Sequence, residues 1–417
     1  MASLRSFFNV NAKGKGKGPI LRNLRDQIMT HASIDTKIYV SFLAVAMLDA
    51  LGNPLQGEKR VENRVIDEMR PHPTSNRPPG YWTDDTSMML CIAHALSTAK
   101  DPEENRVEQI MALREWRNRG IRSSIDVCFD IPPQVSSAID MFTENDSDPD
   151  HALHLIRSAH CSDDDDENTS GSLSRVLPLA VSFWREPIQA KVYGKVNSEI
   201  THASLLCKES SSLLSYLIAL ILQRVVDHHW KRYDEEEKNL SKLTLVHEIA
   251  NFPFENNALR ENLTVPFGII DRPEADDERE SWYFKHITLL RNIAEQQVPN
   301  TSTSFPFVIP SEDQLKSGDH ALQVTLSALY CFFATKTFED GALMAVNLCG
   351  QASTVGAVYA SLAAPFYVGD EEKDKLFWTK KVREWRKGLQ RQDLLDVEAR
   401  KMIQLAHIRL EEERSTP

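Results

Sequence analysis

Residues 81–96 read YWTDDTSMMLCIAHAL, a stretch in which polar residues give way abruptly to an apolar pattern. From Met89 to Leu96 the apolar residues follow the i, i+3, i+4, i+7 spacing of side chains that share one helix face. Thr83 can cap such a helix, and Asp84 and Asp85 fall in its first turn. The segment therefore predicts a helix that begins at two adjacent carboxylates.

Two interpretations of these carboxylates remain open from the segment alone. Acidic residues near a helix N-terminus are favoured by the helix dipole, and Thr83 is an ordinary N-cap residue. Alternatively, Thr83, Asp84 and Asp85 present adjacent hard oxygen atoms, which are the ligands that Mg²⁺ and Mn²⁺ prefer.

Similar helical patterns recur on both sides of this segment, and no stretch shows a convincing run of period-two strands. Asp35 or Thr36 can cap a helix that runs to Leu51, where Gly52 and Pro54 supply a stop. The prolines and glycine of residues 70–80 predict a loop. Further helices are predicted at about 205–231, 285–298, 318–335, 339–349, 353–364 and 392–412. The fold class that follows is all-α, a single large orthogonal helical bundle.

The chain divides into one domain with two short tails. Residues 1–30 are basic and glycine-rich, which predicts a flexible tail, and residues 413–417 form a second tail. The helical domain then spans 31–412. Acidic stretches near 161–170 and 233–238 interrupt it, and we interpret them as solvated insertions because they lack the glycine and the alternation of an EF-hand loop.

Composition excludes several classes of function. The net charge of −12 argues against a protein that binds nucleic acid, because that affinity comes largely from clustered Lys and Arg. The longest apolar run, Leu213–Val226, is shorter than the roughly 20 residues needed to span a bilayer, which predicts a buried helix and no membrane partner. Six cysteines without paired spacing and the lack of a secretory signal near Met1 predict an intracellular protein, cytoplasmic or nuclear.

Asp49 is a polar residue in an unfavourable position. It falls near the C-terminal end of its predicted helix, where the carbonyl dipoles disfavour an anion. A partner is therefore expected, and it can be an arginine, a backbone amide from a neighbouring loop or a cation.

The segment 338–369 predicts two helices that break at Gly350. Gln351, Ser353 and Thr354 crowd the turn between them, where free backbone amides and hydroxyls can bind an anion or a metal, or merely cap the helix. Small residues recur every four positions from Gly356 onward. Close helix packing is therefore predicted on that face.

Two further constellations carry weaker signals. In Gly171–Arg175 a turn leads to an arginine that suits a pyrophosphate or a carboxylate, although a structural ion pair explains Arg175 equally well. Thr201 and His202 precede a helix, where a histidine is more often structural than catalytic.

Taken in order, these motifs resemble the ADP-ribosylglycohydrolase family over about residues 35–410. The landmarks are LDALG at 48–52, WTDDT at 82–86, CFDI at 128–131, GSLSR at 171–175, ITH at 200–202, and FED at 338–340 leading into AVNL at 345–348. Such ordered agreement is more specific than any single motif.

The resemblance implies an all-α fold with a cleft that holds two Mg²⁺ or Mn²⁺ ions, which grip the distal ribose of ADP-ribose and orient a water. Thr83, Asp84 and Asp85 match the first ligand cluster of the family, and Thr354 ends the second. Where the family has two aspartates before that threonine, this chain has Gln351 and Ser353. A glutamate that often follows the family's first motif is Gln56 here. The resemblance also implies substrate contacts for Ser172, Arg175, Thr201, His202, Gly350 and Gln351. In the phosphate-binding turn, Ser170 and Ser174 replace the usual Asn and Met.

These departures predict a weakened site. Hard cations in a desolvated cleft need anionic oxygen, and the matching positions keep only Asp84 and Asp85. We therefore expect one metal ion, with Thr83, Ser353 and Thr354 as additional ligands, and slow hydrolysis.

Two functions follow from this comparison of motifs. The first is a hydrolase that cleaves the bond between ADP-ribose and a protein side chain or a related acceptor, with Asp84, Asp85 and Asp49 as catalytic residues. Asp84 and Asp85 bind one metal ion, and Asp49 or another group behind the metal ligands assists the water. The second is a non-catalytic descendant that binds ADP-ribose or a related nucleotide, or serves as a structural or regulatory protein.

Overall fold

The computed structural model describes residues 19–60, 65–75, 77–98, 105–162, 164–227, 240–264, 282, 286–296, 306–369 and 374–415. Within these ranges the regular structure is helical, apart from one isolated bridge between Ile28 and Ser241. This confirms the predicted all-α class. The helices are α2 (Pro19–Asp26), α3 (Ile34–Gly52), α4 (Asp84–Thr98), α5 (Asn105–Arg119), α6 (Pro133–Glu144), α7 (Pro149–Ala159), α8 (Leu177–Ser182), α9 (Pro187–Glu199), α10 (Leu205–Asp227), α11 (Lys242–Ala250), α12 (Asn257–Leu263), α14 (Thr288–Gln296), α15 (Ala321–Ala334), α16 (Phe338–Asn347), α17 (Ala352–Tyr367), α18 (Lys380–Gly388) and α19 (Gln392–Ser415), with short 3-10 turns at Asn53–Leu55 and Asp165–Glu167.

Helices α3 and α17 form the centre of the molecule and pack against each other along their length, with Gly52 against Ala352 at one end and Lys37 bonded to the carbonyl of Pro365 at the other. Almost every residue of α3 after its first turn is buried, as is all of α17, so both helices are apolar on all sides. A Cβ atom on Gly356 of α17 would lie 3.0 Å from the carbonyl oxygen of Leu48 on α3. The predicted close packing along the small residues of α17 is therefore confirmed.

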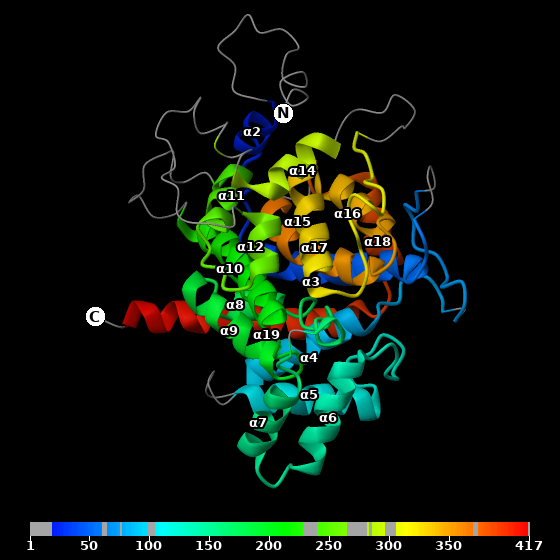
Figure 1. Ribbon diagram of the computed structural model, residues 1–417, viewed down its shortest axis with the longest axis vertical. Helices are drawn as coiled ribbons and strands as arrows, with labels where there is room; N and C mark the ends of the chain where they lie inside the picture. The colour runs from blue at the N-terminus through cyan, green and yellow to red at the C-terminus, as the bar shows by residue number, and fades with distance from the viewer. Residues whose placement is uncertain are drawn as a thin grey trace, which may run out of the picture.

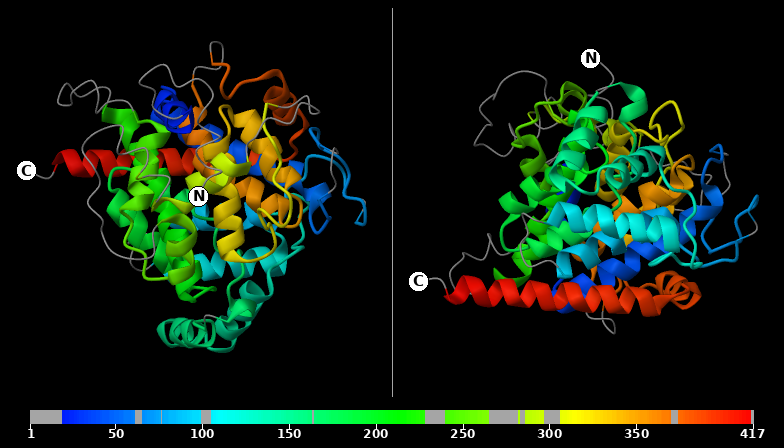
Figure 2. Two further views of the ribbon diagram at one scale, coloured as in Figure 1. Left: turned by 45° about the horizontal axis from the view of Figure 1, so that its top comes forward. Right: turned by 90° about the horizontal axis from the view of Figure 1, so that it is seen from below.

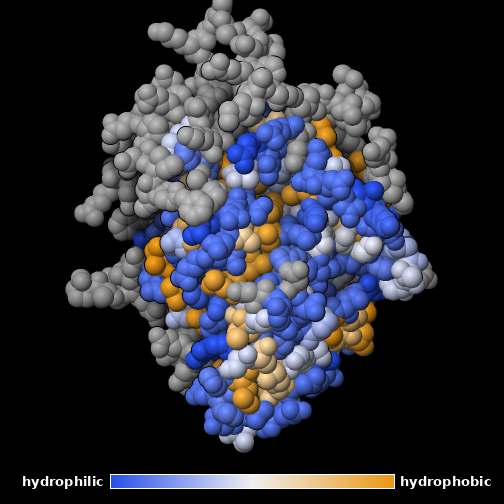
Figure 3. Space-filling view, in the orientation of Figure 1, coloured by the Kyte–Doolittle hydropathy of each residue, from blue (hydrophilic) through white to orange (hydrophobic). Residues whose placement is uncertain are grey.

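The other helices surround this pair. Helix α19 runs along one edge of the molecule as a long straight helix and packs on α3, α4 and α8 (Figure 2). Helices α5, α6 and α7 extend from α4 as a lobe, at the bottom of Figure 1. The face shown in Figure 3 is mainly hydrophilic, with small hydrophobic patches between the charged residues.

Two helices are long and apolar enough to cross a membrane by length and composition, Ile34–Leu55 and Leu205–Val225. Their apolar windows are 89% and 83% buried inside the fold. The prediction that Leu213–Val226 belongs to a buried helix is confirmed as far as the described residues extend, because α10 packs against α3, α9 and α17.

The N-terminal boundary differs from the predicted one. Helix α2 lies within the predicted flexible tail, yet Leu24 and Met29 are buried, and the amide of Thr30 donates to the carbonyl of Phe366 at 3.0 Å. Apolar anchors among basic residues were too few to form a periodic pattern. The predicted tail before residue 19 lies outside the described residues.

Other helix boundaries also differ from the predicted ones. Helix α3 is capped by Ser33, whose Oγ accepts from the amide of Thr36, and not by Asp35 or Thr36. Helix α19 continues to Ser415, beyond the predicted domain end at 412. In the acidic stretch near 161–170, Asn168 and Ser170 are buried, so only its first part is solvated. The acidic stretch at 233–238 and the predicted helix ends at 231, 285 and 298 lie outside the described residues.

Candidate active site

Asp49 fastens the start of α4 to the end of α3. Its fully buried carboxylate accepts hydrogen bonds from the amide of Thr83 at 3.0 Å and from the Oγ of Thr83 at 2.7 Å. The amide and the Oγ of Thr86 donate to it at 3.0 and 2.6 Å. Burial raises the pKa of Asp49, while these four donors favour its ionised form and act in the opposite sense. Of the predicted partners, backbone amides of a neighbouring loop are the ones that the structure shows.

This arrangement favours a positioning role for Asp49 over the predicted catalytic one. Both of its oxygens are engaged by α4, and the residue does not line the cavity described below. We therefore assign Asp49 a positioning role: it fixes the first turn of α4, and with it Asp84 and Asp85.

Asp84 and Asp85 lie side by side at the N-terminus of α4, as predicted. Burial raises the pKa of Asp84 well above its usual range, and repulsion from Asp85 raises it further. Burial also raises the pKa of Asp85 to about 8, with Asp49 adding to the effect. Thr354 at the start of α17 donates from its Oγ to Asp85 Oδ2 at 3.0 Å. The fold thus brings the two predicted motifs together.

These residues line a cavity of about 300 Å³, which we call the acidic cavity. Its wall is built from the turn after α3, the loop that carries His72, the residues at the start of α4, the turn at 130–133, the turn at 170–171, the loop before α15 and the first turn of α17. The prediction counted two carboxylates at the matching positions, but Asp130 and Asp319 also line the cavity.

The two additional carboxylates are held differently. Asp130 pairs with Arg77 at 2.9 Å, and the guanidinium of Arg77 lies over the ring of Phe129. Asp319 accepts from the amide and the Oγ of Ser170 at 3.1 and 2.6 Å, both at Oδ1. No periodic signal marked Asp319, because it lies in an irregular loop. Asp130 lies within the landmark motif at 128–131, but that motif did not predict that Asp130 would line the cavity.

Neutral side chains at the start of α17 and in the turn after α3 form a hydrogen-bond network beside the cavity. Gln56 Oε1 accepts from the amide and the Oγ of Ser353 at 3.2 and 2.9 Å, and Gln56 Nε2 donates to Gln351 Oε1. Thr354 Oγ is also within 3.4 Å of Gln351 Oε1. The amide oxygens that could face a cation are thus already accepting hydrogen bonds.

The site residues predicted at the turn between α16 and α17 lie in three different places. Gln351 and Thr354 line the acidic cavity, whereas the buried Ser353 bonds to Gln56 and is not among the lining residues. Gly350 lines a neighbouring cavity. The roles predicted for Ser353 as a metal ligand and for Gly350 as a substrate contact remain predictions.

Four predicted substrate-binding residues lie one layer behind the cavity. Arg175 donates to Asn197 and, at 2.6 Å, to the Oγ of Thr201, which lies 2.7 Å from His202 Nδ1. His202 Nε2 is 3.0 Å from the Oγ of Thr169. Burial lowers the pKa of Arg175 to about 9 and that of His202 well below its usual range, so the histidine is neutral.

This inner layer supports the turn at 170–171, which does line the cavity. A Cβ on Gly171 would lie 3.0 Å from the ring of His202, so the turn packs directly on the histidine. Ser172 is also buried, with its Oγ 3.2 Å from that of Ser211. None of Ser172, Arg175, Thr201 and His202 is among the residues that line the acidic cavity, and their direct contact with a substrate remains a prediction.

The oxygen atoms that line the acidic cavity are of the type that hard divalent cations prefer. Asp84 and Asp85 supply two adjacent carboxylates, and Thr83 and Thr354 add hydroxyl oxygens, which suits Mg²⁺ or Mn²⁺ completed by water or substrate. At the position of a second ion, Gln351 and Ser353 carry no negative charge. Among the residues described by the structure, no group of three or more His, Cys, Asp or Glu side chains is arranged to hold a metal.

A sequence model of the ADP-ribosylglycohydrolase family matches residues 30–414, nearly the whole chain. The chain belongs to the ADP-ribosylglycohydrolase family. Membership confirms the resemblance that the ordered motifs carried.

Relatives within the family are distant. An uncharacterised protein of Archaeoglobus fulgidus is 24% identical over 383 residues, covering 90% of this chain and 99% of the relative. The ADP-ribosylarginine hydrolase Tri1 of Pseudomonas putida is 23% identical over 350 residues, covering 82% and 75% of the two chains. The Tri1 protein of Serratia proteamaculans is 21% identical, covering 78% and 70%.

A solved structure also shares the fold. A chain from an ADP-ribosylglycohydrolase-related protein complex aligns with a TM-score of 0.54 at 20% identity, and the alignment covers 89% of this chain and 99% of that one. At this identity the likeness shows the fold alone.

Proposed function

We propose that this protein binds an ADP-ribosyl group in the acidic cavity and hydrolyses the bond between its ribose and a protein side chain. The observation that carries the proposal is the pair of carboxylates, Asp84 and Asp85, which Asp49 fixes at the cavity opposite Thr354. Family membership supports the ADP-ribosyl group as the ligand.

Mg²⁺ or Mn²⁺ is the cofactor that this donor set suits. Asp84 and Asp85 would hold one ion, with Thr83 and Thr354 as hydroxyl ligands. When bound, such an ion supplies positive charge that orients hydroxyl and water oxygens. Burial is the main cause of the raised pKa values of the two aspartates, and neighbouring carboxylates add to it, so a bound cation would favour their ionised forms.

The proton acceptor for the attacking water is, in this proposal, a carboxylate other than Asp49. Gln56 has no basic group near neutral pH, and Asp130 is paired with Arg77. Asp319 uses Oδ1 for both bonds from Ser170, which leaves Oδ2 to accept a proton. We therefore assign this role to Asp319.

A second candidate function is ligand binding without turnover. The network of Gln56, Gln351 and Ser353 favours it, because these neutral groups satisfy one another and add no negative charge to balance a second ion. Such a protein would bind ADP-ribose and release no product.

One set of measurements separates the two candidates. Purified protein with Mg²⁺ or Mn²⁺ is incubated with arginine-, serine- and glutamate-linked ADP-ribosylated proteins, and free ADP-ribose is quantified with and without EDTA. Hydrolysis requires release that EDTA abolishes and that Asp319→Asn slows by a factor of about 100. Calorimetric binding of ADP-ribose without any release supports the second candidate. Neither binding nor release contradicts both.

A further inference from the structure

A second cavity of about 580 Å³ adjoins the acidic cavity. The amide of Gly57 donates to the carbonyl of Gly350 at 2.7 Å, and the amide of Gln351 donates to that of Ser317 at 2.7 Å, so three chain segments are tied into one wall. Consecutive residues of each segment line opposite sides of this wall. The pairs are Gln56 and Gly57, Gly318 and Asp319, and Gly350 and Gln351.

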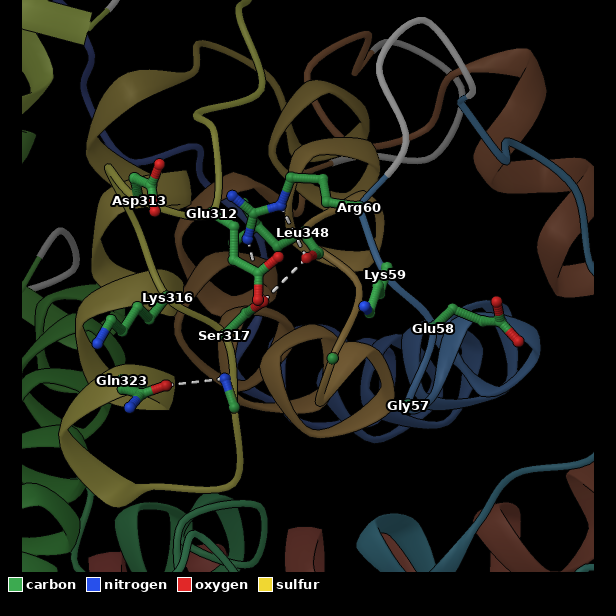
Figure 4. A pocket seen from close by; sticks show the side chains of 12 residues that line it. Gly57, Glu58, Lys59, Arg60, Glu312, Asp313, Lys316, Ser317, Gln323 and Leu348 are labelled. Carbon is green, nitrogen blue, oxygen red and sulfur yellow. Dashed lines mark hydrogen bonds between the residues drawn. The ribbon is translucent and has the colours of Figure 1, made fainter.

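The second cavity differs in charge from the first. The acidic cavity is lined by four carboxylates and by no lysine or arginine, whereas the second is lined by side chains of both signs. In Figure 4 Lys59 and Glu312 extend into the cavity from opposite sides, while Glu58 and Asp313 point away from its centre. Both Lys59 and Glu312 are exposed. A ligand with both charges, and not a simple anion, matches this lining.

Arg60 builds the cavity and does not offer its charge to a ligand. Its guanidinium donates to the carbonyl oxygens of Leu348 and Leu315, both at 2.9 Å, to that of Pro310, and to the Oγ of Ser317 at 3.0 Å. It thereby holds the loop at 57–60 against the loop at 310–317 (Figure 4). By contrast, Lys59 and Glu312 form no hydrogen bond or ion pair within the part of the chain that the structure describes.

We propose that the second cavity binds the polypeptide that carries the ADP-ribosyl modification, next to the modified residue. This inference rests on the proposed function. A modified protein brings two parts to the enzyme, a nucleotide and a polypeptide, and residues that the structure describes line two neighbouring cavities that share one wall. Lys59 then contacts an acidic residue and Glu312 a basic residue that flank the modified side chain.

The test uses the full chain and two charge reversals, Lys59→Glu and Glu312→Lys. Matched controls are Lys380→Glu and Glu384→Lys on α18, at side chains that are 93% and 57% exposed and line neither cavity. Calorimetry at low salt measures the affinity for free ADP-ribose and for ADP-ribosylated peptides whose flanking residues are acidic or basic.

We expect Lys59→Glu to weaken binding of the acid-flanked peptide about fivefold, and Glu312→Lys to weaken binding of the base-flanked peptide by a similar factor. Free ADP-ribose should bind all variants as it binds the wild type. Peptide affinities that do not change overturn the inference, and so does a lower affinity for free ADP-ribose, which would assign the cavity to the nucleotide. If the wild type binds neither free ADP-ribose nor any peptide, the proposed function itself fails.

Discussion

Ser353 donates from its Oγ to the side-chain oxygen of Gln56 at 2.9 Å, although 297 positions separate the two residues in the sequence. The same amide group donates to Gln351. Three neutral residues therefore satisfy one another at the wall of the acidic cavity, where a second cation would require negative charge.

We predict that Gln351→Asp combined with Ser353→Asp tightens Mn²⁺ binding by at least tenfold, on the order of 1.4 kcal/mol, because two carboxylates join Asp84 and Asp85. Titration calorimetry measures this directly. Gln323→Asp, which adds a carboxylate to the second cavity, is the control and should leave the affinity unchanged. Equal affinities of the double variant and the wild type would show that the turn does not face the cation.

Replacing the carboxylate of Asp49 or of Asp84 by an amide should change the stability of the protein in opposite directions. Asp49→Asn should lower the free energy of unfolding by about 3 kcal/mol, because an amide cannot accept all four hydrogen bonds from Thr83 and Thr86. Asp84→Asn should preserve or raise stability, since it removes a carboxylate whose charge is disfavoured by burial and by repulsion from Asp85. Urea denaturation without divalent cation measures both. A destabilised Asp84→Asn variant with a stable Asp49→Asn variant would reverse our assignment of roles.

Gly52 is required by the close approach of α17. A Cβ there would lie 2.6 Å from the carbonyl carbon and oxygen of Ala352, which are backbone atoms. Gly52→Ala should therefore destabilise the protein by about 2 kcal/mol. Gly388→Ala is the matched control, because its Cβ would first meet Met69 Sδ at 3.5 Å, an ordinary contact. Thermal unfolding distinguishes the two, and equal melting temperatures would contradict the packing of α3 on α17.

Lys37 should make stability depend on pH. Its buried Nζ donates to the carbonyl oxygens of Thr30, Pro365 and Val368, and burial lowers its pKa to about 7, an effect that Asp374 partly offsets. Between about 7 and 10.5 the unfolded chain binds more protons at this lysine than the folded chain does. Stability contributed by this group therefore rises with pH across that window.

The measurement is the melting temperature from pH 7 to pH 9.5. Lys37→Met cannot titrate, so its melting temperature should rise less than that of the wild type over this range. Parallel pH profiles of the two proteins would show that Lys37 keeps its proton when folded.

The helical class, the family and the two motifs that meet at the acidic cavity could all be predicted from the amino-acid sequence. These follow from local causes: apolar spacing identifies a buried helix face, and adjacent carboxylates at a helix start remain adjacent after folding. The need of Asp49 for a partner also followed from its place near a helix end.

Which side chains face the cavity and which support it could not be predicted, because this depends on how distant segments pack. Asp49, Ser353 and Arg175 are residue types that often act in a functional site. Here each is hydrogen-bonded to another segment, Asp49 to α4, Ser353 to Gln56 and Arg175 to Asn197. Asp319 joins the cavity from an irregular loop. The direction of a side chain and the satisfaction of its hydrogen bonds depend on packing between segments far apart along the chain, and local patterns carry no record of that packing.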